Sequence, residues 1–347
     1  MTSAKPRQVL ITTYLEPALV DRLSAEFKEL EFSYPLPLLP LPRYPSDHRL
    51  PQADSPAAID QWSELLTQAE ILFDFGPPQL HLELRKMPEL RWIQATSAGV
   101  GQFATRVGLD QPGAPVITTA RGVHGPALAE FAAMSLIALN RDLQGTLHNQ
   151  ARHLWVRGAG RLVRGQTVVI VGLGSIGREV ARLLSFLGAT TVGVVRSLDG
   201  RTASDLGVDE LHSYLELDPW LQLADVLVLS CPHTPETDRL IDARRLKLLR
   251  PSAIVINLAR GQVVDEPALI RALADSRLGG AALDVAATEP LPGDSPLWDL
   301  PHVIISPHSA STVAGENQAI VDIFAANLRA YLHGDELINV LHPGRLY

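Results

Sequence analysis

The sequence predicts an α/β protein with a doubly wound parallel sheet, and its length of 347 residues is enough for two domains. Short apolar runs alternate with longer segments of helical periodicity along nearly the whole chain. Most of these runs are continuously apolar, which is typical of strands covered by helices on both faces. One run leads directly into a glycine-rich turn, GLGSIG at 172–177. Together these features favour repeated β–α–β units.

Composition excludes several other classes of protein. The hydrophobic share of 46% and the charged share of 20% are those of an ordinary globular chain. A net charge of −8 argues against nucleic-acid or anionic-membrane partners, which require a basic surface. Cys231 is the only cysteine, so a disulfide scaffold is excluded. No apolar run is long enough for a signal peptide or a membrane span, and we therefore expect a soluble, cytoplasmic protein.

The N-terminal part of the chain carries short strand and helix signals around a proline-rich stretch. Strands are expected at 9–12, 71–75, 91–96 and 116–119, with a helix over 16–30. Seven prolines interrupt this pattern between residues 33 and 56. We interpret that segment as an irregular surface loop, and a polyproline peptide ligand is the alternative.

The second part of the chain is more regular. Six buried strands are expected, at 167–172, 190–195, 225–230, 253–258, 280–285 and 302–306. A helical stretch over 312–333 comes after the last of them and has no strand to follow it.

The GLGSIG turn has the spacing of a dinucleotide phosphate-binding loop. It follows a strand and opens a helix that runs to about residue 187, and this context makes the motif specific. Gly172 permits the tight turn, Gly174 lets a pyrophosphate approach the backbone, and Gly177 lets the helix pack closely on the strand. The exposed amides of the helix N-terminus favour the anion. A merely tight strand–helix turn is the alternative.

The end of the next strand indicates which coenzyme is bound. An NAD-binding unit places an acidic residue about 20 positions after the turn, where it accepts from the ribose 2′-hydroxyl. This chain instead has Arg196 and Ser197, which suit a 2′-phosphate, and Arg201 is close enough in sequence to assist. The sequence therefore favours NADP over NAD. In the alternative, Asp199 serves the ribose and Arg196 is a solvated surface charge.

Three later strands each end next to one polar residue suited to catalysis. Arg260 follows the strand at 253–258, Glu289 follows that at 280–285, and His308 follows that at 302–306. Ligands of open parallel sheets bind beyond the carboxyl ends of the strands, so all three should face the coenzyme. A histidine and a carboxylate can transfer a proton, and an arginine can stabilise negative charge, so the three together are suited to catalysis.

With these motifs, the sequence resembles the D-isomer-specific 2-hydroxyacid dehydrogenase family. The segments that carry the resemblance are GLGSIG at 172–177, CPHTPETDRLID at 231–242, NLARGQVVDEPAL at 257–269, DVAATEPLP at 284–292 and PHSAST at 307–312. The resemblance covers about residues 90–333. It implies a Rossmann nucleotide-binding domain, residues 119–311, inserted in a smaller flavodoxin-like substrate domain made of residues 1–118 and 312–347.

The same resemblance implies roles for individual residues. Arg260 holds the carboxylate and carbonyl of a 2-keto acid, His308 is the acid/base, and Glu289 pairs with His308. Ala98 and Gly99, in TSAGVGQF, match the loop whose amides bind the substrate carboxylate, with a plain glycine turn as the alternative. Further coenzyme contacts are implied at His308 and at Ser175, Ile176, Cys231, Pro232, Thr237, Leu258, Ala259 and Asp284. Cys231 has no basic neighbour in sequence, so we interpret its thiol as a packing group rather than a reactive one.

These observations predict an NADP(H)-dependent reductase of small 2-keto acids, of the glyoxylate or hydroxypyruvate type. Two alternatives are an NAD-dependent catabolic D-2-hydroxyacid dehydrogenase and a nucleotide-sensing corepressor or scaffold on the same fold. Glu289 disfavours a formate dehydrogenase, whereas a phosphonate dehydrogenase retains the same three residue types. No cluster at metal-ligand spacing is present, and His81, His148, His153 and His302 read as surface or structural groups.

A homodimer is the last expectation. The run PALAEFAAMSLIAL, residues 126–139, predicts a helix in which Glu130 is the only charge. One side can pack on the sheet, and the other needs a cover. A second copy of the chain would supply it, and burial within one subunit is the alternative.

Overall fold

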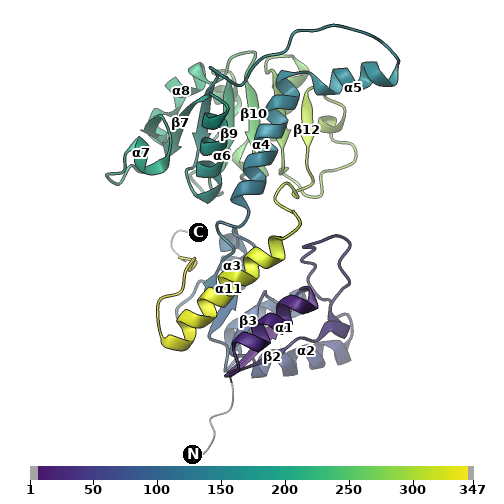
Figure 1. The fold of residues 1–347 in the computed structure, drawn as a ribbon, viewed down its shortest axis with the longest axis vertical. Helices are drawn as coiled ribbons and strands as arrows, with labels where there is room; N and C mark the ends of the chain where they lie inside the picture. Colours follow the sequence, from purple (N-terminus) through teal and green to yellow (C-terminus); the bar gives the residue numbers. More distant parts are fainter. Residues whose placement is uncertain (1–6, 343–347) are drawn as a thin grey trace, which may run out of the picture. The chain divides into compact units, whose positions relative to one another are not determined.

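A computed structural model describes residues 7–342 of the chain. It contains two compact units, each with its own parallel sheet (Figure 1). The first unit comprises residues 1–124 and 312–347, and the second comprises Gly125–Ser311. The first boundary therefore lies after His124 rather than after residue 118, because residues 119–123 still belong to the first unit: the Thr119 amide donates to the Asn339 carbonyl (3.0 Å), and Ala120 is buried in that unit's core.

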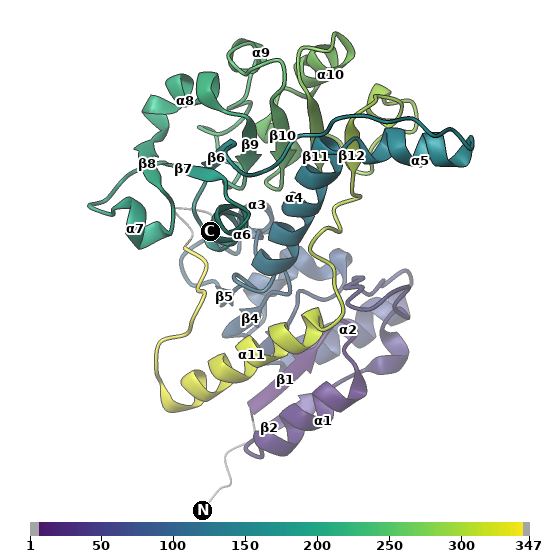
Figure 2. The ribbon, with the colours of Figure 1, turned by 45° about the horizontal axis from the view of Figure 1, so that its top comes forward.

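The sheet of the first unit has five parallel strands in the order β2-β1-β3-β4-β5. Helices α1 and α11 contribute to the hydrophobic cluster on one face, while α2 and α3 contribute to the cluster on the other. Figure 2 shows α11 running beside α1, although most of the chain separates them in sequence. The strands are β1 (Arg7–Ile11), β2 (Leu30–Ser33), β3 (Ile71–Phe73), β4 (Trp92–Gln94) and β5 (Val116–Thr118).

The sheet of the second unit has seven parallel strands in the order β12-β11-β10-β9-β6-β7-β8. Alternate residues of each strand enter two hydrophobic clusters: Val169 packs with α8, α9 and α10, and Val168 packs with α4 and α6. This is the doubly wound arrangement expected from the continuous apolar runs. The strands are β6 (Thr167–Val171), β7 (Thr190–Val195), β8 (Glu210–Ser213), β9 (Val226–Leu229), β10 (Ile254–Asn257), β11 (Gly280–Leu283) and β12 (Val303–Ile305).

Helices connect these strands in both units. The α-helices are α1 (Pro17–Glu26), α2 (Pro56–Gln68), α3 (Gly101–Val107), α4 (Gly125–Asn140), α5 (Leu143–Ala151), α6 (Ser175–Phe186), α7 (Ala203–Leu206), α8 (Leu217–Leu223), α9 (Ala243–Leu246), α10 (Glu266–Ala274) and α11 (Glu316–His333). The 3₁₀ turns are η1 (Leu36–Leu38), η2 (Pro78–Lys86), η3 (Tyr214–Glu216), η4 (Gly261–Val263) and η5 (Pro296–Trp298). None of the helices described is long and apolar enough to cross a membrane.

Three elements differ from the sequence-based prediction. The helix expected over 16–30 ends at Glu26, because Leu30 begins strand β2 and pairs with Arg7. Strand β8 was not predicted: it is a short edge strand of sequence ELHS, whose polar side chains hide the strand signal. The C-terminal helix begins at Glu316 rather than at 312, since Gly315 precedes it with a φ of +91°.

The proline-rich segment is irregular, as expected, but it is not purely a surface loop. It contains the 3₁₀ turn η1, and its residues Leu39 and Ala53 are buried in the core of the first unit. Arg43 and Asp47 form a bidentate pair, with Nε to Oδ2 at 2.8 Å, that closes the middle of the segment. The prolines therefore shape a packed part of the first unit.

Candidate active site at the strand ends of the second unit

The glycine turn between β6 and α6 has the shape that an anion-binding loop requires. Gly172 has a φ of +96°, and a Cβ there would lie 2.7 Å from the Cys231 amide nitrogen. A Cβ on Gly177 would lie 2.0 Å from the Gly172 carbonyl oxygen, so only glycine permits this close packing. A Cβ on Gly174, in contrast, would meet nothing within 4 Å. Each glycine thus has the environment expected for its role.

The first turn of α6 can receive a phosphate. Gly174 is the N-cap residue, and no side chain caps the helix there. Ser175 and Ile176 form the first helical positions, so their backbone amides point out of the helix end. The glycine cradle and these uncapped amides fit the pyrophosphate of a dinucleotide.

The turn after β7 contains both residues expected to choose the coenzyme. Arg196 is exposed, and its Nη2 atom lies 3.5 Å from Glu236 Oε1. The Ser197 hydroxyl donates to Asp199, and Arg201 Nη2 donates to the Ser197 carbonyl oxygen at 2.7 Å. Two guanidinium groups and one carboxylate therefore share this turn.

The segment after β9 lies against the glycine turn. The Cys231 side chain is buried in the core, and burial raises the pKa of its thiol to about 12. Such a thiol stays protonated and packs, in keeping with the sequence interpretation. Thr237 Oγ1 donates to the carbonyl oxygen of Pro232 at 2.7 Å and thereby holds the segment in a compact turn.

Ser230 was missed by the sequence analysis. Its hydroxyl donates to the Gly172 carbonyl oxygen at 2.8 Å, which ties the end of β9 to the glycine turn. The bond joins two adjacent strands at the point where the sheet order changes direction, where ligands of such sheets bind.

The backbone around Arg260 is held by a buried amide. Asn257, the last residue of β10, accepts from the Ala259 amide (3.0 Å) and donates to the Arg260 carbonyl oxygen (3.1 Å). Leu258 and Ala259 bury their side chains in the core, so they can offer a ligand only their backbone. Asn257 was not singled out from the sequence, although a buried amide at the end of an apolar strand is a signal for such a role.

Arg260 is partly buried in the loop that follows β10. Burial lowers the pKa of its guanidinium, and the negative charges of Glu289 and Asp284 oppose that effect. The group remains a cation in neutral solution, since arginine does not deprotonate in proteins. It can therefore bind a carboxylate with two parallel N–H groups.

His308 and Glu289 form the pair that the sequence predicts. His308 Nδ1 lies 2.8 Å from Glu289 Oε2, and the other carboxylate oxygen accepts from the Ala286 amide at 3.1 Å. Because the carboxylate accepts, Nδ1 carries a hydrogen and Nε2 is left for a substrate. His308 has a φ of +52°, and its amide donates to the Asp284 carbonyl oxygen at 2.8 Å.

Asp284 has a structural role that the sequence did not suggest. It is buried, and its Oδ1 atom accepts from the amides of Ser309 (3.0 Å) and Ala310 (2.9 Å). This oxygen therefore fixes the loop that carries His308, a role in addition to the coenzyme contact that the resemblance implies for Asp284.

The two catalytic loops are joined to each other. Gln262 donates to the Ala287 carbonyl oxygen (2.9 Å), and Glu266 accepts from the Ala287 amide (2.8 Å). A Cβ on Gly261 would lie 1.9 Å from the Ala286 carbonyl carbon, so the loops touch backbone to backbone there. Arg260 and Glu289 are held by one hydrogen-bonded assembly as a result.

The loop assigned to the substrate carboxylate lies in the first unit. We call residues 96–100 the substrate loop; it follows β4 and contains Ala98 and Gly99. The Ala120 amide donates to the Ser97 carbonyl oxygen at 3.2 Å, which ties the loop to the segment after β5.

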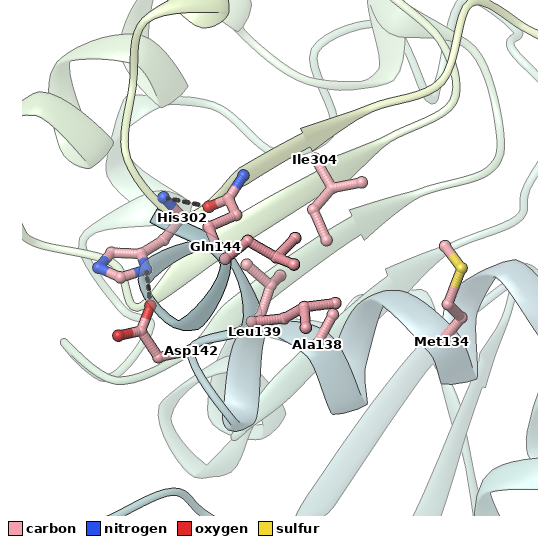
Figure 3. A pocket seen from close by; sticks show the side chains of 9 residues that line it. Met134, Ala138, Leu139, Asp142, Gln144, His302 and Ile304 are labelled. Atoms are coloured by element: carbon pink, nitrogen blue, oxygen red, sulfur yellow. Dashed lines mark hydrogen bonds and ion pairs between the residues drawn. The ribbon is translucent and has the colours of Figure 1, made fainter. Parts of the chain in front are cut away.

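A cavity of about 230 Å³ lies elsewhere in the second unit, between α4, α5 and the start of β12 (Figure 3). Asp142 and Gln144 both point at His302: Gln144 Oε1 accepts from the His302 amide at 3.1 Å, and Asp142 lies 3.9 Å from the ring. His302 precedes β12, so this cavity is at the edge opposite the catalytic residues. Its lining is mainly apolar, with Met134, Leu139, Leu143 and Leu147 among the side chains.

Three further histidines noted in the sequence have different environments. His81 is buried and contacts the Gly76 carbonyl oxygen at 3.0 Å, whereas His148 and His153 are exposed. Between residues 7 and 342, no three His, Cys, Asp or Glu side chains are arranged to hold a metal ion.

Comparisons with known proteins agree with this geometry. Residues 133–310 match the model of the D-isomer specific 2-hydroxyacid dehydrogenase family, NAD binding domain. The chain belongs to this family.

The similarity of this chain to known proteins extends beyond that domain. A D-3-phosphoglycerate dehydrogenase of Mycobacterium bovis is 36% identical over 69% of this chain and 46% of its own length. The chain thus spans about half the length of the phosphoglycerate dehydrogenases it matches. A glyoxylate reductase of Thermococcus kodakarensis is 32% identical over 74% of this chain and 80% of its own. A solved 2-hydroxyacid dehydrogenase of Xanthobacter autotrophicus Py2, in complex with NADPH and MES, is 26% identical, covers 99% of this chain and 100% of its own, and has a TM-score of 0.77.

Proposed function

We propose that this dehydrogenase transfers a hydride between NADP(H) and a small 2-keto acid or D-2-hydroxy acid, as a glyoxylate or hydroxypyruvate reductase does. The observation that supports the proposal most directly is the 2.8 Å contact of His308 Nδ1 with Glu289 Oε2. These two residues follow β12 and β11, and Arg260 follows β10, the next strand of the sheet. The similarity to a glyoxylate reductase over 80% of that protein's length points to the same reaction.

Each catalytic side chain has a distinct task in this mechanism. NADPH, when bound, supplies the hydride for the keto carbon. Arg260 binds the carboxylate and carbonyl oxygen of the substrate, and the amides of Ala98 and Gly99 bind the carboxylate. His308 gives the proton on Nε2 to the carbonyl oxygen as negative charge develops there, and Glu289 stabilises the imidazolium through Nδ1. The keto acid gains one hydride and one proton and becomes the hydroxy acid.

Glu289 should act through His308, and its replacement tests that link. Glu289→Gln removes the negative charge that favours the protonated imidazole, and reduction needs the protonated form. We expect the alkaline limb of the kcat/KM profile for keto-acid reduction to move to lower pH. An alkaline limb at the parent's position would contradict the pairing.

The preference for NADP is supported by Arg196, Ser197 and Arg201 in the turn after β7. In Arg196→Asp, a carboxylate repels the 2′-phosphate and can accept from a 2′-hydroxyl. We expect the ratio of kcat/KM for NADPH to that for NADH to fall at least about tenfold, because one charge-assisted contact is lost. Arg182→Asp, which changes an exposed arginine on α6, is the matched control.

If the parent already prefers NADH, the preference for NADP is wrong, and Asp199 is then the group that serves the ribose. The enzyme would in that case be the NAD-dependent dehydrogenase of the alternative reading.

We also propose that the dehydrogenase is a homodimer through its nucleotide-binding unit. Helix α4 buries Ala132 and Leu136 completely, while Met134 on its other side is 54% exposed. Beyond α5 the chain exposes Trp155 by 97%. Met134 also lines the cavity of Figure 3, and exposed apolar side chains of this kind suit a self-complementary interface.

Light scattering on the purified chain at micromolar concentration tests the dimer. We expect a mass twice the 37.7 kDa of one chain. A mass of a single chain would overturn this proposal, and Trp155→Ser should shift the protein toward that mass.

A panel of 2-keto acids assayed with each coenzyme tests the proposed reaction. We expect NADPH-dependent reduction of glyoxylate and hydroxypyruvate. Nucleotide binding without turnover of any keto acid would contradict the proposal and favour the sensing or scaffold reading. A cytoplasmic location is proposed with it, supported by the single buried cysteine.

A further inference from the structure

An acidic side chain lies at the carboxyl edge of the first unit's sheet, where a ligand of this fold is expected. Asp74 directly follows β3, the middle strand of that sheet. The neighbouring strand β4 leads into the substrate loop, residues 96–100. The acid and the loop therefore share one edge of the sheet, the edge at which ligands bind.

Asp74 holds the base of the substrate loop. The residue has a φ of +69° and is 4% exposed. Its amide donates to the Gln94 carbonyl oxygen at 2.8 Å, and its Oδ2 atom accepts from the Thr96 hydroxyl at 3.3 Å. The backbone amides of Phe75 and Thr96 also donate to the carboxylate. The carboxylate is therefore bonded to Thr96, which comes two residues before Ala98 in the substrate loop.

The charge of Asp74 has no cationic partner among the ion pairs of residues 7–342. Burial raises the pKa of its carboxyl to about 6, with the hydrogen bonds from Thr96 and Phe75 opposing the rise. His81, which contacts the same turn at the Gly76 carbonyl oxygen, supplies no balancing charge, because burial lowers its pKa. At neutral pH the base of the substrate loop is therefore predominantly negative.

We propose that Asp74 restricts the enzyme to 2-keto acids with a single negative charge, by placing a carboxylate beside the substrate loop. Substrates with a second carboxylate or a phosphate are disfavoured, because the added charge enters the field of Asp74. The proposal rests on the proposed function and defines its substrate class.

The expected size of the effect is that of one unit charge acting on another across the length of a small substrate. A charge within about 8 Å of another, at the effective dielectric constant of about 20 that describes protein sites, changes affinity about 30-fold. This figure concerns the second anionic group only, since the first is common to all 2-keto acids.

Two four-carbon 2-keto acids test the proposal. 2-Oxobutanoate ends in a methyl group and oxaloacetate in a carboxylate, so they differ by one charge at similar length. At pH 7.5 the parent should prefer 2-oxobutanoate in kcat/KM. Asp74→Asn, which keeps an acceptor for Thr96, should reduce this preference about 30-fold, mainly through the KM of oxaloacetate. Asp110→Asn, at a half-buried acid of the same unit that accepts from Thr105, is the control and should leave the preference unchanged.

The parent enzyme gives a second measurement that needs no variant. Because the pKa of Asp74 is about 6, lowering the pH from 7.5 to 5 protonates most of the carboxyl, while both carboxylates of oxaloacetate stay ionised. The preference for 2-oxobutanoate should shrink about tenfold over this range in the parent and stay constant in Asp74→Asn.

Each outcome decides between the proposals. Turnover of both acids with a preference that neither the pH nor Asp74→Asn changes would overturn the role of Asp74 and leave the reductase intact. A KM change of equal size for both acids would show that Asp74 only supports the loop. No turnover of any keto acid by the parent would overturn both the selection and the proposed function.

Discussion

His308→Gln is expected to lower kcat for keto-acid reduction by at least about 10²-fold. Glutamine fills a similar volume but has no proton to give to the carbonyl oxygen. The phosphate cradle is built from β6 and α6, away from the His308 loop, so the affinity for NADPH should be largely kept. Steady-state kinetics with glyoxylate, together with a fluorescence titration of NADPH, measures both quantities.

His212→Gln is a matched control for this variant. His212 also pairs with a carboxylate in the second unit, with Nε2 3.2 Å from Glu210 Oε2, but it lies on the edge strand β8. Its loss should leave kcat within about twofold of the parent. A near-normal kcat in His308→Gln would remove that histidine from the mechanism.

Arg260→Lys is expected to raise KM for the keto acid and to lower kcat, so that kcat/KM falls about 10- to 100-fold. Lysine keeps the positive charge but loses the planar fork that binds a carboxylate and a carbonyl oxygen together. Binding of the carboxylate sets KM, and stabilisation of the developing alkoxide sets kcat, so both constants should change.

Arg250→Lys provides the comparison for Arg260→Lys. Arg250 donates to Asp225 at 2.8 Å in front of β9 and β10, at the edge of the same sheet opposite Arg260. Kinetics like those of the parent are expected for this variant. If Arg260→Lys also behaved like the parent, the substrate carboxylate would have to bind elsewhere.

The three residues that we assign to catalysis were found from the sequence because each lies shortly after a continuous apolar strand. In a parallel sheet all such positions come to one edge, so Arg260, Glu289 and His308 could be assigned to one site without coordinates. The glycine turn could also be identified from the sequence, because its glycines have the expected spacing and lie between a strand signal and a helix signal.

Residues that act across the sheet could not be found in the same way. Ser230 bonds to Gly172, and Asp284 bonds to the loop at 309–310, over 25 or more positions in sequence. Asp74 was read as part of a strand over 71–75, whereas β3 ends at Phe73. Because β3 ends earlier than predicted, Asp74 lies at the carboxyl edge of the sheet and not within the strand.

Two of the elements were misjudged for local reasons. Strand β8 lacks an apolar signal because an edge strand needs little burial, and Leu30 continued a helical spacing although it begins β2. In both places the chain is a strand because it pairs with a neighbouring strand of the sheet, β7 for β8 and β1 for β2.

Arg260, Glu289 and His308 all belong to one unit and are held there by loops that touch backbone to backbone at Gly261. The residues that we assign to substrate selection, Asp74 and the loop after β4, are encoded in the other unit. This division makes the enzyme modular for engineering. A designer could exchange the segments around 74 and 96–100 for those of a relative to change the accepted acid, while Arg260, Glu289 and His308, to which we assign the reaction, stay unchanged.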